Sequence, residues 1–218
     1  MTTALLTTKL YIPSLRHEVV SRPRLIEQLN AGMFSKLTLI SAPAGFGKTT
    51  LLSEWISTLR PRNVENQWMG KNTKDKGSQS RIHNRVAWLS LDERDNDPER
   101  FWIYFIAALQ TIAPELGATM LALLESHPVA PSFSMTSKPR WVEKETNHKQ
   151  KAEIAKQPDQ IEIALTALIN EIAVNQQGDE YRPLILVLDD YHVLETEAIH
   201  AGITFLLDHL PHPGGLHI

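Results

Sequence analysis

The sequence predicts an α/β fold in which helices pack on both faces of a mainly parallel β-sheet. Three short apolar runs, at residues 37–41, 86–91 and 184–188, are separated by longer segments with apolar residues at helical spacing. Parallel strands covered on both faces have this appearance, because neither face meets water. A chain of 218 residues with 42% hydrophobic residues can form one domain around a substantial core.

The predicted elements alternate along the chain, and several have recognisable starts. After a short extended lead-in at 9–13, Ser21 can cap a helix in which Pro23 takes an early position. Asp97 and Pro98 mark another helix start in the same way. The helix that follows is rich in aromatic residues, which we expect to pack in the core. The predicted order is helix 23–30, strand 37–41, a helix to about 59, strand 86–91, helix 98–111, helix 114–125, helix 160–174, strand 184–188, helix 195–210 and the start of a strand at 216–218.

Two polar segments, at residues 61–84 and 127–157, interrupt this order. They contain few apolar residues and many of the residue types that favour loops, so we expect both to be solvated insertions. The final residues 216–218 resemble the first residues of a strand. We therefore expect residues 1–218 to form a partial domain whose sheet is truncated at its C-terminal end.

A glycine-rich loop follows the first predicted strand directly and reads A-P-A-G-F-G-K-T. Gly45 and Gly47 permit a backbone whose N–H groups point inward at a phosphate. Lys48 places a cation at the terminal phosphates, and the Thr49 hydroxyl can bind Mg²⁺. The pattern departs from G-x-x-x-x-G-K-[ST] only at Ala42, which fits if that position is not left-handed. The motif predicts a P-loop NTPase three-layer sandwich. Its candidate nucleotide-binding residues are Ala42, Pro43, Ala44, Gly45, Phe46, Gly47, Lys48, Thr49 and Thr50.

Two aspartates, Asp189 and Asp190, follow the five consecutive apolar residues 184–188. The carboxyl ends of parallel strands are where open α/β sheets bind ligands. Asp189 can hold the Mg²⁺ shell together with Thr49, usually through water, and Asp190 can polarise the attacking water. We therefore predict a nucleotide-phosphate site with Mg²⁺ as cofactor, and Asp190 as the candidate catalytic residue.

Composition and charge exclude several classes of function. There is no cysteine, which excludes disulfides and cysteine-ligated zinc and fits a reducing cytoplasm. Neither a signal peptide nor an apolar stretch long enough to cross a membrane is visible. The net charge is −3, but residues 60–85 carry +5 and residues 127–157 carry +3, which leaves −11 on the rest. Because so acidic a core repels nucleic acid, we expect no direct DNA contact by this chain. The histidines at 209, 212 and 217 are predicted to be surface residues.

Five segments resemble, in the same order, the ATPase domain of the large ATP-binding LuxR-type transcriptional regulators. They are K-L-Y-I-P (9–13), V-S-R-P-R-L (20–25), and the segments 37–55, 87–102 and 184–194. The resemblance implies a signal-transduction ATPase of the STAND class. In that class an exchange of ADP for ATP, biased by an inducer, drives self-association that activates transcription.

The resemblance also implies roles for particular residues. Residues 45–50 would hold the phosphates, and Arg22 matches the arginine of the family's N-terminal nucleotide-contacting segment. The strand that starts at Leu216 would lie between the strand of the P-loop and the strand of the two aspartates. Family members continue into an arginine sensor, a winged helix, a helical-repeat region and a helix-turn-helix, so we expect a module that lacks its DNA-binding part.

Two other functions stay open at this point. The first is a phosphotransferase in which Asp190 activates a substrate hydroxyl, although no arginine-rich lid segment follows the two aspartates. The second is a non-catalytic remnant that binds nucleotide without turning it over. The sequence leaves open whether the chain is an enzyme, a slow ATPase, and it does not identify the inducer or the oligomeric state.

Overall fold

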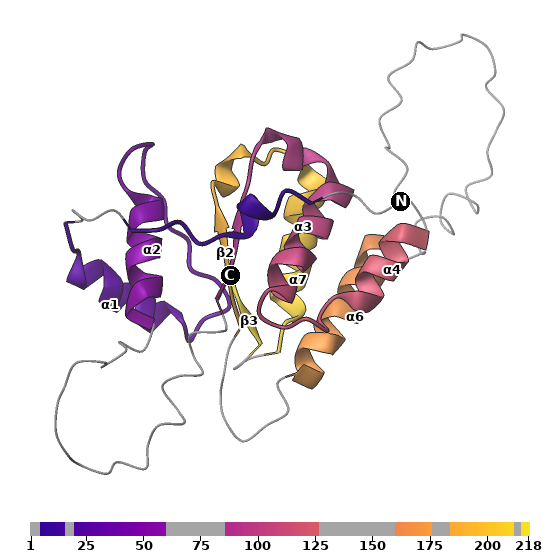
Figure 1. The fold of residues 1–218 in the computed structure, drawn as a ribbon. Helices are drawn as coiled ribbons and strands as arrows, with labels where there is room; N and C mark the ends of the chain where they lie inside the picture. Colours follow the sequence, from indigo (N-terminus) through magenta and orange to yellow (C-terminus); the bar gives the residue numbers. More distant parts are fainter. Residues whose placement is uncertain (1–4, 16–19, 60–85, 127–159, 176–183, 212–214) are drawn as a thin grey trace, which may run out of the picture.

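The computed structural model describes residues 5–15, 20–59, 86–126, 160–175, 184–211 and 215–218. Within these residues the fold is α/β, with helices on both sides of a small parallel sheet (Figure 1), and this confirms the predicted fold class. Both predicted insertions, 61–84 and 127–157, lie outside the described residues. The elements are η1 (Thr7–Leu10), α1 (Pro23–Gly32), α2 (Lys48–Leu59), β1 (Val86–Ser90), η3 (Glu93–Asn96), α3 (Pro98–Gln110), α4 (Ala118–Ser126), α6 (Gln160–Asn175), β2 (Leu184–Asp189), η4 (Tyr191–Val193), α7 (Glu197–His209) and β3 (Leu216–His217).

The sheet has the order β1-β2-β3, and both pairs of neighbouring strands are parallel. Val86 pairs with Ile185 at the start of the β1–β2 ladder, and Ser90 pairs with Asp189 at its end. The two strands therefore end at the same edge. This register brings the loop after β1 beside the loop after β2, which carries the two aspartates.

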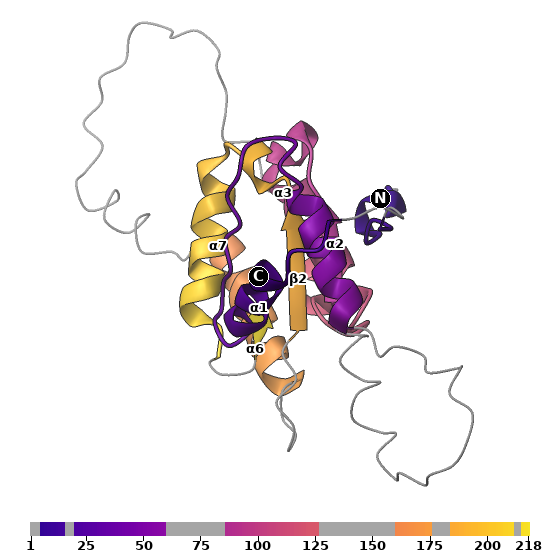
Figure 2. The same cartoon turned by 90° about the vertical axis from the view of Figure 1, so that its left-hand side faces the viewer.

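Side chains of the two longer strands alternate between two hydrophobic layers. Val86, Trp88, Ile185 and Val187 pack with α1 and α2, and the residues between them pack with α3, α6 and α7. Figure 2 shows β2 between α7 on one side and α2 on the other. Because both faces are covered, every position of these strands except the last of β1 and the fifth of β2 is buried.

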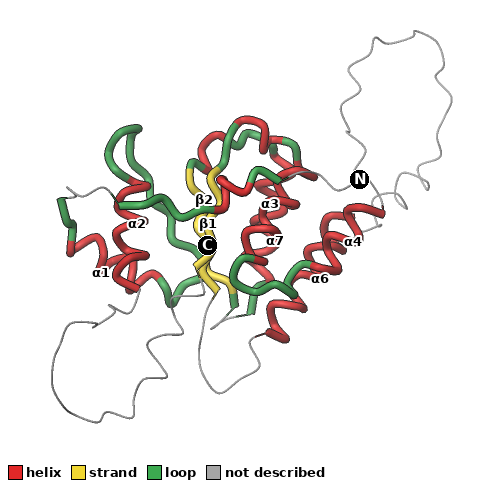
Figure 3. Tube along the Cα trace, viewed as in Figure 1, coloured by secondary structure: helices red, strands yellow, loops and turns green. Residues whose placement is uncertain are grey.

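The prediction of a strand at 37–41 is wrong. The first residues of this segment nevertheless lie beside the strand that starts at Leu216, as the resemblance implied. The Thr38 N–H donates to the Ile218 carbonyl at 2.9 Å, and the Ile218 N–H donates to the Lys36 carbonyl at 3.0 Å. Residues 36–38 thus run beside the end of β3, and β3 lies between them and β2. Further along, the segment is a loop (green in Figure 3), and Leu39 is 77% exposed. A strand needs a ladder of backbone partners, and among the described residues this segment has only Ile218.

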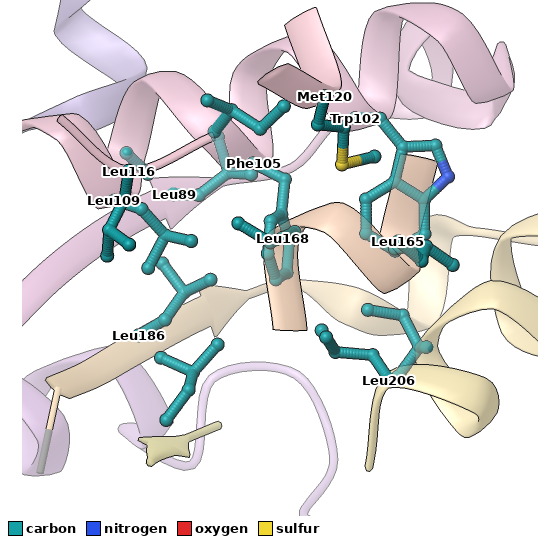
Figure 4. Packing of buried hydrophobic residues seen from close by; sticks show 14 of the residues in the cluster. Leu89, Trp102, Phe105, Leu109, Leu116, Met120, Leu165, Leu168, Leu186 and Leu206 are labelled. Carbon is teal, nitrogen blue, oxygen red and sulfur yellow. The ribbon is translucent and has the colours of Figure 1, made fainter. Parts of the chain in front are cut away.

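The larger core is centred on the aromatic helix α3 (Figure 4). Phe101, Trp102 and Phe105 are fully buried, and Trp102 makes edge-on ring contacts with the other two at 5.0 and 5.1 Å. This confirms the prediction that the aromatic residues pack in the core. Helix α7 approaches closely at Gly202, where an added Cβ would lie 2.6 Å from Cζ2 of Trp102.

The N-terminal segment is attached to the start of α3 through a buried lysine. Lys9 is 6% exposed, and its ammonium pairs with Asp92 at 3.1 Å and with the fully buried Asp95. Arg100 contributes a second cation to Asp95 at 3.1 Å, and Tyr104 lies under the lysine at 4.9 Å. Buried charges need partners of this kind, so the lead-in segment is fixed beside the carboxyl end of β1.

Candidate nucleotide-binding site

The loop between residues 42 and 47 has the backbone that phosphate binding requires. Gly45 and Gly47 have φ angles of 82° and 78°, in the left-handed region that favours glycine. Ala42 is not left-handed, because Asp190 is the one non-glycine residue with positive φ in the described part of the chain. The departure from the consensus therefore leaves the loop geometry intact. Helix α2 begins at Lys48, so its first N–H groups have no partner within the helix and are available at this loop.

Lys48 lies over the loop rather than extending away from it. Its ammonium donates to the Ala42 carbonyl at 2.9 Å and to the Pro43 carbonyl at 3.4 Å. Both acceptors are neutral backbone oxygens, and Lys48 forms no ion pair with a residue that the structure describes. The lysine charge thus stays available for an anionic group bound in the loop, where charge-assisted hydrogen bonds are stronger.

The most informative contact of the site joins residues that are far apart in the sequence. The Thr49 hydroxyl at the start of α2 lies 3.1 and 3.0 Å from the two carboxylate oxygens of Asp189 at the end of β2. Asp189 is buried, and this burial raises its pKa above the ordinary value. The Thr49 hydrogen bond opposes the shift, while the neighbouring charge of Asp190 adds to it.

This donor pair fits Mg²⁺. A hydroxyl and a carboxylate are hard oxygen ligands, and a nearby cation favours the charged form of a buried carboxylate such as Asp189. Among the described residues no group of three or more acidic, histidine or cysteine side chains is arranged so that it could hold a metal ion by itself. Mg²⁺ commonly takes one or two carboxylates and completes its shell with phosphate oxygens and water, so the small protein contribution is consistent with that metal.

Asp190 differs from its neighbour in both exposure and backbone. It is exposed, its φ and ψ are 59° and 33°, and its carboxylate lies 3.8 Å from Nδ1 of His192. Aspartate is one of the few residues that tolerate this left-handed conformation. The reversal of the chain here points the two aspartates in different directions, with Asp189 toward Thr49 and Asp190 toward solvent.

Arg22 lies against the loop. Its guanidinium donates to the Phe46 carbonyl at 3.0 Å and comes within 3.6 Å of the position that a Cβ on Gly47 would take. Arg22 immediately precedes α1, which packs on α2. The helix pair therefore carries the arginine to the loop.

A pocket of about 370 Å³ opens between α1, residues 38–42 and the loop. Its lining combines apolar side chains with the polar side chains of Gln28, Thr38 and Ser41 and with the cations Arg22 and Lys48. Sequence reasoning found the loop residues and Arg22, but it missed the helix α1 residues, because their spacing indicates only a packed face. The lining residues are Arg22, Leu25, Gln28, Leu29, Thr38, Leu39, Ile40, Ser41, Ala42, Phe46, Gly47, Lys48 and Leu51.

The prediction that the C-terminal histidines lie at the surface is wrong for His217. This residue of β3 is 4% exposed, and its Nδ1 lies 2.6 Å from the Ser35 carbonyl, which can only accept. Burial lowers the pKa of His217 below its usual value. The burial follows from the position of β3 between β2 and residues 36–38. His209 is exposed as predicted, and His212 lies outside the described residues.

The fold and the arrangement of Thr49, Lys48 and Asp189 define a class: an α/β domain compatible with the P-loop NTPase-like sandwich. Comparison with known proteins agrees. Over 207 residues, 95% of the chain, the sequence is 30% identical to the HTH-type transcriptional regulator MalT of Serratia proteamaculans (strain 568) and to that of Klebsiella pneumoniae (strain 342). The identity to MalT of Yersinia pestis (strain Pestoides F) is 29% over the same length.

The chain is thus similar to the MalT transcriptional regulators over nearly its whole length, which confirms the resemblance to a large transcriptional regulator. It spans 16% of the length of these relatives. No protein-family model matches the chain. In the described part of the chain, each helix is too short or too polar to cross a membrane.

Proposed function

We propose that this chain is the ATP/ADP-binding module of a LuxR-type transcriptional regulator, and that it hydrolyses ATP slowly with Mg²⁺ as a switch. The observation that carries the proposal is the contact between Thr49 and Asp189 at 3.0 and 3.1 Å. A hydroxyl after the loop lysine and a carboxylate after a buried parallel strand are the two protein groups that a Mg²⁺–nucleotide complex needs.

In this proposal the loop binds the phosphate chain. The N–H groups at the start of α2 and the Lys48 ammonium would bind the β- and γ-phosphates, and the lysine would exchange two neutral carbonyl partners for charged oxygens. Thr49 and Asp189 would hold Mg²⁺, which neutralises charge on the phosphates when it is bound. Asp190 would orient a water and accept its proton as the water oxygen bonds to the γ-phosphorus and ADP leaves with the bridging oxygen.

The pocket beside the loop supports a nucleotide rather than a bare polyphosphate as the ligand. Its volume lies within the range of small-molecule sites, and its apolar wall would cover a base. Gln28 offers an amide that can both donate and accept a hydrogen bond. Arg22 would face the phosphates from the opposite side of Gly47.

The regulatory part of the proposal depends on the relatives. They are named as HTH-type transcriptional regulators, and the chain aligns with a limited part of each. We therefore assign this chain the switch, in the cytoplasm, and assign DNA contact to another part of the regulator. An inducer and self-association complete the proposal, as the resemblance implies.

Calorimetric titration of the chain with ADP and ATP, with and without Mg²⁺, tests the proposal. Lys48→Ala removes a charged hydrogen bond to the phosphates, so affinity should fall by about 1.5–3 kcal/mol. Lys36→Ala is the matched control, because Lys36 also donates to two carbonyls, those of Leu207 and Asp208 at the end of α7. Equal affinity of the wild type and Lys48→Ala for ATP would refute the proposed site.

A further inference from the structure

Asn96, at the end of η3, joins the loop after β1 to the loop after β2 by hydrogen bonds. Its Nδ2 donates to the Val193 carbonyl at 2.8 Å. Its Oδ1 accepts from the Glu195 N–H at 2.6 Å and from the Thr196 N–H at 3.2 Å. The Thr196 hydroxyl also donates to the Asn96 carbonyl at 2.6 Å. The two loops are about 100 residues apart in sequence, so these hydrogen bonds are long-range tertiary contacts.

An asparagine is required for this pattern. The second hydrogen of Nδ2 points at the Glu93 carbonyl at 3.2 Å, so the amide uses both of its donors and both lone pairs of its oxygen. Aspartate would present an oxygen to the Val193 carbonyl, where two acceptors repel each other. Alanine would leave the two backbone N–H groups at 195 and 196 without this acceptor. The side chain therefore fixes the position of the turn formed by residues 190–196.

The helical turn η3, which ends at Asn96, is itself held rigidly. In η3, Asp92 and Asp95 cap each other's backbone, and Asp95 is fully buried between Lys9 and Arg100. A helical turn held by buried, paired charges does not shift easily. Asn96 ends this turn, so its amide starts from a fixed point.

The turn that Asn96 holds carries Asp190 in a left-handed backbone conformation. Such a conformation persists where surrounding bonds determine it. Inside the turn, the Val193 N–H donates to the Asp190 carbonyl at 3.0 Å, so the carbonyl and N–H of Val193 connect Asn96 to Asp190.

A second contact fixes the other side of the turn. Nε2 of His200 lies 3.1 Å from the Leu194 carbonyl, which can only accept, so Nε2 carries the proton. Nδ1 of His200 then accepts from the Tyr191 hydroxyl at 2.8 Å. The residue after Asp190 is thereby attached to α7, and the tautomer of His200 reports whether the turn is intact.

From these contacts we infer that Asn96 is a positioning residue, which sets the direction of the Asp190 carboxylate toward the attacking water. This inference rests on the proposed ATP hydrolysis. In the described part of the chain, the Asn96 side chain bonds to backbone groups of residues 93, 193, 195 and 196 and to the Thr196 hydroxyl. Asn96 is not among the residues that line the pocket, so it acts through the turn. The inference predicts that Asn96 governs the rate of the chemical step, whereas the affinity for nucleotide depends on the loop and Lys48.

The test measures single-turnover hydrolysis of Mg²⁺–ATP and its dissociation constant in the full chain. Asn96→Ala should slow hydrolysis by about 10²-fold, the effect expected of a catalytic group displaced by about 1 Å. The dissociation constant should stay the same within about twofold, because binding and turnover are separable parameters. As a second, milder pair, Thr196→Val should slow hydrolysis and Thr196→Ser, which keeps the hydroxyl, should restore the wild-type rate.

Glu171→Ala is the control for a merely structural effect. Glu171 of α6 accepts from the Gly117 N–H at 2.6 Å and the Thr119 N–H at 3.3 Å, so its loss also removes a long-range acceptor of two backbone N–H groups. It should lower the melting temperature and leave the hydrolysis rate unchanged. The side-chain nitrogen NMR shifts of His200 provide a readout independent of activity, and they should show tautomer exchange in Asn96→Ala only.

The outcomes separate this inference from the function on which it rests. A hydrolysing wild type whose rate does not change in Asn96→Ala would overturn the inference alone. A loss of rate in Glu171→Ala equal to that in Asn96→Ala would also overturn it, because the effect would then be global. A wild type that binds ATP and never hydrolyses it would overturn the hydrolytic part of the proposed function, and the positioning role with it.

Discussion

The contact between Thr49 and Asp189 allows a quantitative test of the site in the absence of any ligand. We consider Thr49→Val, which keeps the shape of the side chain and removes the hydroxyl. A hydrogen bond to a charged group contributes about 1.5–3 kcal/mol to stability, and one between neutral groups contributes about 0.5–1.5 kcal/mol. Because Asp189 is only 7% exposed, water does not easily replace the lost donor. Thr49→Val should therefore lower the free energy of unfolding by about 1.5–3 kcal/mol at neutral pH.

The same bond should be weaker when the acceptor is neutral. In an Asp189→Asn background the side-chain oxygen can still accept from Thr49, so Thr49→Val should cost about 0.5–1.5 kcal/mol. The coupling free energy between the two sites is then about 1 kcal/mol. Urea unfolding of the wild type, both single variants and the double variant measures it, and Thr49→Ser is the control that keeps the hydroxyl.

The pH dependence of Asp189→Asn follows from the raised pKa of the carboxyl. An acid with a raised pKa in the folded state destabilises the fold as the pH rises from the ordinary value, 3.8, through the folded value. Asp189→Asn should therefore stabilise the free protein at neutral pH, and the gain should disappear toward pH 3.8. If Thr49→Val had no effect on stability in either background, the two side chains would not meet in solution and the reasoning for a Mg²⁺ site would fail.

Three further predictions concern the structure that surrounds the site. Gly202→Ala should lower the free energy of unfolding by about 1–3 kcal/mol, because the overpacking against Trp102 exceeds the roughly 1 kcal/mol by which alanine favours a helix; melting curves measure this. Lys9→Met should cost about 3–5 kcal/mol in urea unfolding, since Asp95 keeps a buried charge and loses one of its two close cations. Between pH 6.5 and the lowered pKa of His217, the unfolded state binds a proton at this histidine more readily than the folded state does. The free energy of unfolding should therefore fall as the pH drops below about 6.5, and His217→Asn should remove that fall.

Each of these three predictions has a matched control. Ala201→Gly changes helix propensity on the exposed side of α7 and should cost about 1 kcal/mol with no clash. Adding Asp95→Asn to Lys9→Met should recover part of the loss, because the unpaired charge is then gone. His209→Asn, at an exposed position, should leave the pH dependence unchanged. Unchanged stability of Gly202→Ala would contradict the close packing against Trp102. Unchanged stability of Lys9→Met would contradict the buried ion pair with Asp95, and a wild-type stability that does not vary below pH 6.5 would contradict the burial of His217.

Local patterns in the sequence determined the parts of the fold that depend on one stretch of chain. The runs at 86–90 and 184–189 are buried strands, because an apolar run covered on both faces has no other stable place in a domain of this size. The glycines at 45 and 47 permit the left-handed backbone that the structure has there, and the first of the two aspartates ends a strand. Chemistry that depends on residue type and on neighbours a few positions away is visible in the sequence.

Tertiary structure alone decided which distant residues meet. The segment 37–41 has strand composition, yet whether it forms a strand depends on backbone partners that its own residues do not encode. Lys9, Asn96 and His217 look like surface residues, because polar side chains are normally solvated, but each gains a partner 83 to 182 positions away. A polar residue becomes part of a buried network only after packing brings its partner within hydrogen-bond distance, and local periodicity carries no information about that distance.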